Sequence, residues 1–337
     1  MDLDEDGVVA PIFIVGTGRS GTSLLRALLN AHPNIHITQE AGFFLWLPRL
    51  RRAKTAEAWL RGYQSTAAGA LLGPLSVHAR PGAPRSESVE LVTALMRAKA
   101  ARFGRDRFGD KTPLHITRLD AIFAAYPAAK VIHVVRHPVP TVVSMMEMPW
   151  ASNSASLNAL MVRVAVDAAR PFAERILEVR LEALLEAPRE VLGRVLDFVG
   201  EPWDEAVLHH SERAPFEEDP RLPWLVDAER PLRAPGALRA VPLGPRLTRR
   251  VEAICAPVMS RFGYAPWPEP GPERPWSVSR DLAAALGFGV RTLTTARPEQ
   301  DDPDAVSAAD QLRWLFNLNP SPTIPDSARA LPPLPTR

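Results

Sequence analysis

The sequence contains little cysteine and little lysine. Its one cysteine, Cys255, has no partner for an intrachain disulfide, and a cysteine-based zinc cluster is excluded. Because Cys255 lies in the apolar run VEAICAPVM, we predict that it is a small buried hydrophobe. Only four of the 40 basic residues are lysines. This bias, together with abundant alanine and proline, indicates a GC-rich genome rather than a function.

Long apolar runs and a secretion signal are also lacking. No uninterrupted apolar stretch approaches the roughly 18 residues of a membrane-spanning helix. The first ten residues, MDLDEDGVVA, are acidic, whereas a signal peptide begins basic and continues apolar. We therefore expect a cytoplasmic protein without a membrane span.

The chain has almost no excess of charge of either sign. A formal net charge of +2 argues against a protein that coats nucleic acid, although it is compatible with local basic pockets. A hydrophobic content of 46% and a charged content of 23% are ordinary for a globular protein with a substantial core. At 337 residues, one large domain with an appendage is expected.

Strand and helix patterns alternate along most of the chain. Short apolar runs rich in β-formers predict strands at 11–15, 35–38, 107–113, 130–135 and 176–180. Helical spacing predicts helices at 22–32, 86–102, 117–125, 138–144, 181–200 and 246–262, the last closing at Gly263. This alternation predicts an α/β protein with a P-loop-type three-layer fold, in which helices cover both faces of a central parallel sheet.

Two segments interrupt that regular pattern. Residues 41–85 lack a repeating pattern, and they either shape a substrate pocket or form helical cover for the sheet. After residue 264 the composition changes, and 13 of the 35 prolines follow. We predict a domain over 1–265 and a Pro-rich extension over 266–337, whose short helices at 280–288 and 310–318 dock on the domain or on another subunit. A homo-oligomer formed through this extension is therefore one expectation.

A glycine-rich turn joins the first predicted strand to the first helix. Its sequence is Gly16-Thr17-Gly18-Arg19-Ser20-Gly21-Thr22-Ser23. Backbone N–H groups converge at such a turn and the helix dipole favours negative charge, so it is an anion site. The spacing fits the nucleotide P-loop except that Thr22 stands where an NTPase needs lysine, and the basic residue of the turn is Arg19. This substitution weakens the kinase or NTPase interpretation.

The longer run GTGRSGTSLLRALLNAHPNI resembles the 5′-phosphosulfate-binding loop of sulfotransferases that use 3′-phosphoadenosine-5′-phosphosulfate (PAPS). The carbohydrate and tyrosylprotein branches and their bacterial relatives carry a similar Arg-Ser-Gly-Thr core. The resemblance implies that PAPS is the co-substrate. It also implies that its 5′-phosphate and sulfuryl group are held by Gly18, Arg19, Ser20, Gly21, Thr22 and Ser23, and that Arg19 is a catalytic residue as well.

A second segment, KVIHVVRHPVPTVVS, places Arg136 after a predicted strand and Ser144 eight residues further on. An arginine fork and a hydroxyl are a suitable clamp for phosphate. The segment resembles the family's 3′-phosphate-binding segment, which implies that these two residues distinguish PAPS from ATP. His137 stands where the family often has an acidic or amide residue. Leu181 replaces the tyrosine expected near adenine, so the adenine contacts are not predicted.

The chemistry of transfer needs a base and a cation. In the carbohydrate and tyrosylprotein relatives, a glutamate at the place of Glu40 is the general base, so the resemblance implies that role here. Lys111 lies in a segment that resembles the family's Asp/Glu-Lys-Thr-Pro and would neutralise charge near the transferred group, unless it only pairs with Asp110. His115 is the alternative base. No metal cluster is apparent, and no metal is expected.

The resemblance implies an enzyme that transfers a sulfuryl group from PAPS to a hydroxyl of an acceptor. The acceptor is a small molecule, a carbohydrate or a tyrosyl group, and the sequence does not choose among them. Two other interpretations stay open. One is a P-loop kinase or NTPase, and the other is a non-catalytic sulfotransferase-like scaffold kept for binding.

Overall fold

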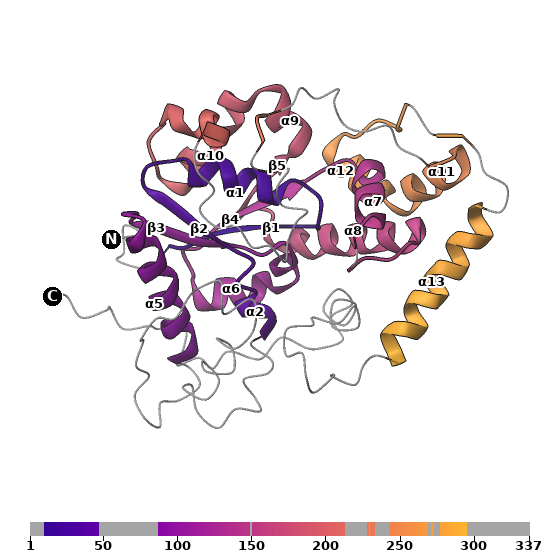
Figure 1. Ribbon diagram of the computed structural model, residues 1–337, viewed down its shortest axis with the longest axis horizontal. Coiled ribbons are helices and arrows are strands. Elements are labelled where there is room, and N and C mark those ends of the chain that lie inside the picture. The colour runs from indigo at the N-terminus through magenta and orange to yellow at the C-terminus, as the bar shows by residue number, and fades with distance from the viewer. Residues whose placement is uncertain are drawn as a thin grey trace.

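A parallel sheet forms the centre of the protein (Figure 1). The computed structural model describes residues 10–46, 87–148, 150–212, 228, 230–232, 243–268, 271–272 and 277–294. Five strands lie in the order β2-β3-β1-β4-β5, and every neighbouring pair is parallel. They are β1 (Ile12–Gly16), β2 (Ile35–Gln39), β3 (Arg107–Lys111), β4 (Lys130–Val135) and β5 (Ile176–Arg180). The predicted strands and the α/β fold are thus confirmed.

Strand β1 shows how the two faces of the sheet become apolar. Its side chains alternate, so Ile12 and Ile14 lie in one buried cluster while Phe13 and Val15 lie in the other. Both faces are covered, which explains why this strand is a continuous apolar run rather than an alternating one. The core therefore lies in two layers, one on each side of the sheet.

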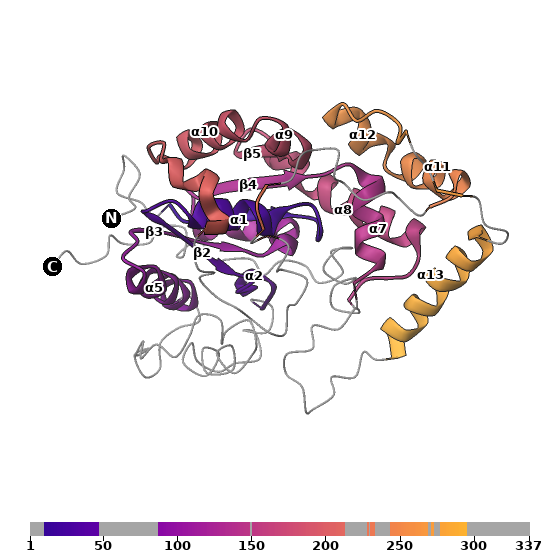
Figure 2. The same ribbon diagram turned by 45° about the horizontal axis from the view of Figure 1, so that its top comes forward.

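Helices cover each face, as Figures 1 and 2 show. The Ile12 face is covered by α1 (Thr22–Asn30), α9 (Leu181–Glu186), α10 (Pro188–Val199) and η4 (Glu205–Glu212). The Phe13 face is covered by α2 (Phe43–Trp46), α5 (Glu87–Arg102), η2 (Pro113–Arg118), α6 (Leu119–Ala125), α7 (Pro138–Met146), α8 (Ala155–Ala169), η3 (Arg170–Phe172), α11 (Pro245–Ile254) and α12 (Ala256–Phe262).

Two helices predicted as continuous are each broken in two by a proline. The predicted helix 181–200 divides at Ala187, whose backbone leaves the helical region directly before Pro188. The predicted helix 246–262 divides at Cys255, two residues before Pro257. Proline lacks an N–H and disfavours a helical residue before it, so each amphipathic pattern continues while the helix restarts.

Helix α8 is an element that we did not predict from the sequence. Ser154 caps it, since its hydroxyl accepts a hydrogen bond from the Leu157 amide at 3.2 Å. Cys255 packs against this helix and donates its thiol to the Ala159 carbonyl at 3.3 Å. The cysteine is fully buried, as predicted, and burial raises its pKa to about 12, so it remains a thiol.

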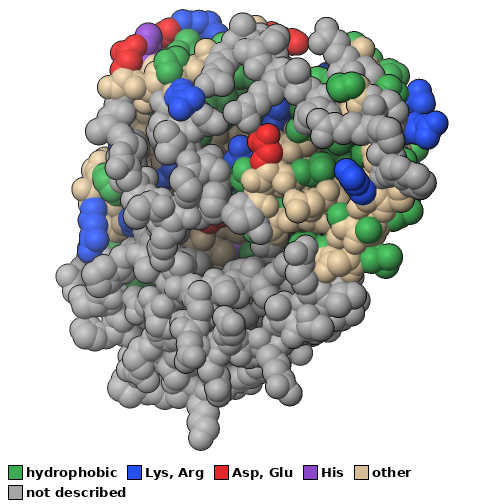
Figure 3. Space-filling view, turned by 45° about the vertical axis from the view of Figure 1, so that its right-hand side comes forward, with side chains coloured by type: hydrophobic (Ala, Val, Ile, Leu, Met, Phe, Trp, Pro, Cys, Tyr) green, Lys and Arg blue, Asp and Glu red, His purple; other side chains and the backbone are tan. Residues whose placement is uncertain are grey.

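The first part of the C-terminal extension packs on the domain. Helix α13 (Ser277–Thr294) includes the predicted helix 280–288, and Asp281 accepts a hydrogen bond from the Ser156 amide at the start of α8. The predicted helix 310–318 lies outside the described residues, as does most of the segment 41–85. Figure 3 shows one face of the molecule, and on the described part of that face the Lys and Arg side chains are scattered rather than clustered in one basic patch.

His36 makes stability depend on pH. Its ring lies fully buried on β2, stacked on Phe103 with a centroid distance of 4.5 Å. Burial, and then the charges of Arg26, Lys99 and Arg105, lower its pKa from 6.5 to about 3. Between about pH 3 and pH 6.5 the unfolded chain binds a proton at this histidine and the folded chain does not. Protonation therefore favours the unfolded chain, and the free energy of unfolding decreases as the pH falls below 6.5.

We expect the free energy of unfolding to fall from pH 7 to pH 4.5, with a contribution from His36 of up to about 1.4 kcal/mol per pH unit. His36→Gln should make this dependence shallower in urea unfolding. His209→Gln, at a histidine whose side chain is 54% exposed, is the control and should leave the dependence unchanged. An unchanged slope in His36→Gln would contradict the assignment.

Candidate active site

The residues predicted to carry function follow the carboxyl ends of four neighbouring strands. The glycine-rich turn follows β1, Glu40 follows β2, Lys111 ends β3 and Arg136 follows β4. Because all the strands are parallel, these ends lie at one edge of the sheet. In open parallel sheets, ligands bind outside this edge, where the strand order reverses.

The turn after β1 forms a concave array of amides. Arg19 and Gly21 have φ of 68° and 101°, in the left-handed region, and such alternation aims successive N–H groups at one point. Gly21 is the N-cap of α1 and supplies no side-chain cap, so the first amides of the helix have no acceptor within it. Together with the helix dipole, these groups favour an anion.

Two glycines of the turn are packed against side chains from distant segments. A Cβ at Gly18 would lie 2.5 Å from the Trp150 ring, and a Cβ at Gly21 would lie 2.7 Å from Leu181. Leu181, which replaces the family tyrosine, is therefore a buried wall behind the turn. Trp150 was not predicted as part of the site, and no local pattern distinguishes it from any other tryptophan.

Two hydroxyls of the turn face inward. Ser20 is fully buried and donates a hydrogen bond to the Thr17 carbonyl at 2.8 Å, which closes the turn on itself. Thr22 is also buried. The remaining predicted hydroxyl, Ser23, lies 3.2 Å from the ammonium of Lys111 and thus connects the turn to β3.

The two predicted arginines meet at the turn. Arg19 Nε donates to the Ser144 hydroxyl at 2.9 Å, and Arg136 donates from its guanidinium to the Arg19 carbonyl at 3.1 Å. Arg19 is thus brought together with two residues more than 100 positions further along the chain. Ser144 lies on α7, two turns after Arg136, as predicted.

Arg136 lacks a full set of partners. Its Nε is buried without a hydrogen-bond partner among the described residues. The pKa of Arg136 is lowered to about 10, mainly by burial. The carboxylate of Glu182 opposes this shift, and the nearby charge of Arg19 adds to it. An anion bound here would accept the free N–H and offset the repulsion between the two cations.

Glu182 was not predicted, yet it holds the turn that carries Arg136. One carboxylate oxygen accepts the His137 amide at 2.8 Å, and the other accepts the Tyr264 hydroxyl at 3.0 Å. The Arg180 guanidinium lies 4.6 Å from the centre of the Tyr264 ring. Glu182 stands next to Leu181 in the sequence, but only the fold shows what it binds.

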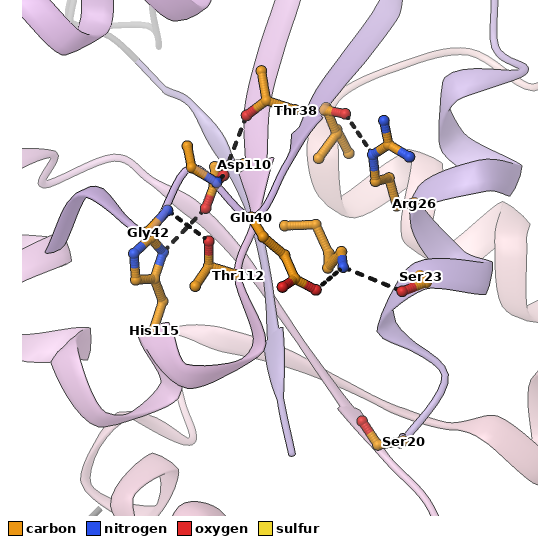
Figure 4. Close-up of polar contacts among 12 residues, drawn as sticks. Ser20, Ser23, Arg26, Thr38, Glu40, Gly42, Asp110, Thr112 and His115 are labelled. Atoms are coloured by element: carbon orange, nitrogen blue, oxygen red, sulfur yellow. Dashed lines mark hydrogen bonds and ion pairs between the residues drawn. The ribbon is translucent and has the colours of Figure 1, made fainter. Parts of the chain in front are cut away.

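Glu40 and Lys111 form an ion pair beside the turn (Figure 4). Lys111 Nζ lies 2.6 Å from Glu40 Oε1, and the lysine is fully buried while the glutamate side chain is 35% exposed. Burial lowers the pKa of Lys111, and the charge and hydrogen bond of Glu40 raise it. One carboxylate oxygen thus faces the lysine in a site that solvent still reaches.

The alternative base, His115, has its ring nitrogens directed at Phe44 and Asp110. Its Nε2 accepts the Phe44 amide at 3.2 Å, so the proton lies on Nδ1, which is 3.2 Å from Asp110 Oδ2. The ring is buried. Asp110 therefore pairs with His115, and the ordinary Asp110–Lys111 ion pair considered from the sequence does not form.

The described residues form neither a candidate metal cluster nor a helix able to span a membrane. Among them, no cluster of three or more His, Cys, Asp or Glu is arranged to hold a metal ion. None of the helices in these ranges has both the length and the apolar character needed to cross a bilayer.

The sequence profile described as "Sulfotransferase family" matches residues 11–205, which is more than half of the chain. The chain belongs to the sulfotransferase family. The matched range begins with β1 and includes the glycine-rich turn, Glu40, Lys111 and the Arg136–Ser144 segment. The matched range thus contains the predicted site residues.

Two relatives of this sulfotransferase are animal proteins. It is 27% identical over 286 residues to "Protein-tyrosine sulfotransferase" of Drosophila melanogaster, which covers 77% of this chain and 52% of the relative. It is 26% identical over 213 residues to "Protein-tyrosine sulfotransferase A" of Caenorhabditis elegans, which covers 60% of this chain and 52% of the relative. The chain spans about half the length of these relatives.

Among solved structures, this sulfotransferase is similar to the sulfotransferase domain of the Synechococcus PCC 7002 olefin synthase. The TM-score is 0.48 at 23% sequence identity, over 79% of this chain and 98% of that one.

Glu40 stabilises the folded protein through Lys111, because it is the counter-charge of a buried ammonium. We expect Glu40→Gln to lower the free energy of unfolding by about 1–3 kcal/mol, since a buried charged donor would lose its partner. Adding Lys111→Met to that variant should recover most of the loss, because removing both members of a buried pair is often nearly neutral. Urea unfolding of the wild type, both single variants and the double variant measures this; four equal stabilities would contradict it.

Proposed function

We propose that this sulfotransferase transfers the sulfuryl group of PAPS to the hydroxyl of an acceptor, with Glu40 as the general base. One observation carries the proposal. Two groups of residues lie at the same edge of the sheet: an anion-binding turn with two arginines, and a carboxylate–ammonium pair whose carboxylate is partly exposed. The first can hold a phosphosulfate, and the second can act on an acceptor beside it.

The donor fits the residues present. The amides of Gly18 to Ser23, the Arg19 guanidinium and the start of α1 would hold the 5′-phosphate and sulfuryl group. The unpartnered Arg136 Nε and the Ser144 hydroxyl would hold the 3′-phosphate. PAPS supplies an activated sulfuryl group when bound, and no metal is part of the proposal.

The chain's own residues have two tasks during transfer. The Glu40 carboxylate accepts the proton of the acceptor hydroxyl as that oxygen becomes the nucleophile. The Lys111 ammonium, already beside Glu40 and Ser23, offsets negative charge that develops next to the turn. Since the ion pair holds one carboxylate oxygen, the other is available to the proton.

A tyrosyl phenol is the first acceptor class to test. The two animal relatives carry the name protein-tyrosine sulfotransferase. A phenol, with a pKa of about 10, gives up its proton to a carboxylate base far more readily than an aliphatic alcohol does. Carbohydrates and small-molecule alcohols are the comparison classes.

The base assignment is tested with labelled PAPS and acceptors of these three classes. We expect transfer to at least one class, most strongly to tyrosyl peptides, and a fall in kcat of about 10²–10⁴-fold in Glu40→Gln. The affinity for the product adenosine 3′,5′-bisphosphate should stay within about twofold, because Glu40 is assigned to the acceptor. A fully active variant would overturn the assignment.

The donor assignment is tested by calorimetric titration. Arg136→Ala should weaken the binding of adenosine 3′,5′-bisphosphate by roughly 10–100-fold, because a charge-assisted bond is lost. It should change the binding of adenosine 5′-phosphate little. Arg163→Ala, at a half-exposed arginine of α8 that pairs with Asp167, is the matched control. Equal losses for both nucleotides would show that Arg136 does not recognise the 3′-phosphate.

A further inference from the structure

Glu40 stands in an unusual backbone conformation. Its φ is 43°, and that of Gly42 two residues later is 63°. A non-glycine residue in the left-handed region is strained and persists only where its surroundings hold it there. The residues that hold this turn therefore determine where the Glu40 carboxylate points.

Four contacts that hold this turn come from one short segment, residues 110–115. The Glu40 amide donates to the Lys111 carbonyl at 2.8 Å. The next amides donate to three side chains: Ala41 to Asp110 Oδ1 at 2.9 Å, Gly42 to the Thr112 hydroxyl at 3.0 Å and Phe44 to His115 Nε2 at 3.2 Å. Figure 4 shows Asp110, Thr112 and His115 gathered on the side of the turn away from Ser23.

The three acceptors are fixed by one another. Asp110 also accepts the Thr38 hydroxyl at 3.2 Å and lies 3.2 Å from His115 Nδ1. Burial would raise the pKa of Asp110, but hydrogen bonds from His115, Thr112 and the Ala41 amide bring it below its usual value. The lowered pKa keeps the Asp110 carboxylate ionised although it is buried, as are the Thr112 and His115 side chains.

We propose that Asp110, Thr112 and His115 are positioning residues for the reaction, which hold the strained turn so that the Glu40 carboxylate lies between Lys111 and the acceptor. The proposal rests on the proposed function, because it acts through Glu40. None of the three is among the groups assigned to the donor, so they should affect the rate and not donor affinity. A displacement of a catalytic group by about 1 Å can cost on the order of 10²-fold in rate.

Thr112 provides the sharpest test, because two substitutions separate its hydroxyl from its shape. Thr112→Val keeps the volume and removes the acceptor of the Gly42 amide, while Thr112→Ser keeps the hydroxyl. We expect kcat to fall at least tenfold in the valine variant and to stay within about twofold of wild type in the serine variant. The Kd of adenosine 3′,5′-bisphosphate should be unchanged in both.

A matched control separates positioning from general loss of stability. Thr248 on α11 is equally buried and donates its hydroxyl to the Leu243 carbonyl at 3.3 Å. Thr248→Val thus removes a comparable buried hydrogen bond away from the site and should leave kcat unchanged. If Thr112→Val does not fold, His115→Phe and His115→Gln replace the pair, since glutamine offers an oxygen acceptor to the Phe44 amide and phenylalanine does not.

The decisive measurement is a double-mutant cycle with Glu40→Gln. If Thr112 acts through Glu40, Thr112→Val should lower the residual rate of Glu40→Gln by less than twofold. A full tenfold loss in the Glu40→Gln background would overturn the positioning role. The role would also be overturned if Thr112→Val were as active as wild type while Glu40→Gln was impaired. A fully active Glu40→Gln would instead overturn the base itself and, with it, the proposal that depends on it.

Discussion

The buried ammonium of Lys111 needs a counter-charge and hydrogen-bond acceptors, and the surrounding residues supply them. It ends β3 where no solvent reaches it, and burial of a charge is unfavourable unless a partner is supplied. Glu40 supplies the counter-charge from the neighbouring strand, and Ser23 supplies a hydroxyl from the start of α1. One cation thereby joins three strand ends, and the carboxylate that neutralises it remains partly open to an incoming molecule.

On the side of the site proposed to bind the donor, positive charge is in excess. Arg19 and Arg136 lie together, and the described residues leave the Arg136 Nε without an acceptor. Glu182 offsets part of this charge while it holds the turn after β4. The folded protein therefore keeps a surplus of positive charge beside the array of amides, while the Glu40 side is balanced. This division suits the proposed donor, which carries several negative charges, on one side and a neutral hydroxyl on the other.

Function and stability are coupled at the turn after β2. Its backbone is strained at Glu40, and the amides that follow are held by Asp110, Thr112 and His115 from a single segment. The same segment contributes Lys111. Because the register of β2 with β3 pairs Thr38 with Asp110 and Gln39 with Lys111, the clamp and the ion pair are both consequences of parallel pairing.

The sequence by itself determined the α/β class, the five strands and the glycine-rich turn, because strand runs and turn residues are local signals. It also singled out Glu40, Lys111, Arg136 and Ser144, through segments that resemble those of sulfotransferases, and the roles of these residues stay predictions. Only the tertiary structure decided the partners: that Lys111 pairs with Glu40, that His115 is occupied by Asp110 and Phe44, and that Trp150 packs on Gly18. Apart from the pairing of Asp110 with His115, these contacts join residues about 70 to 130 positions apart, and they depend on strand order and register, which no local pattern encodes.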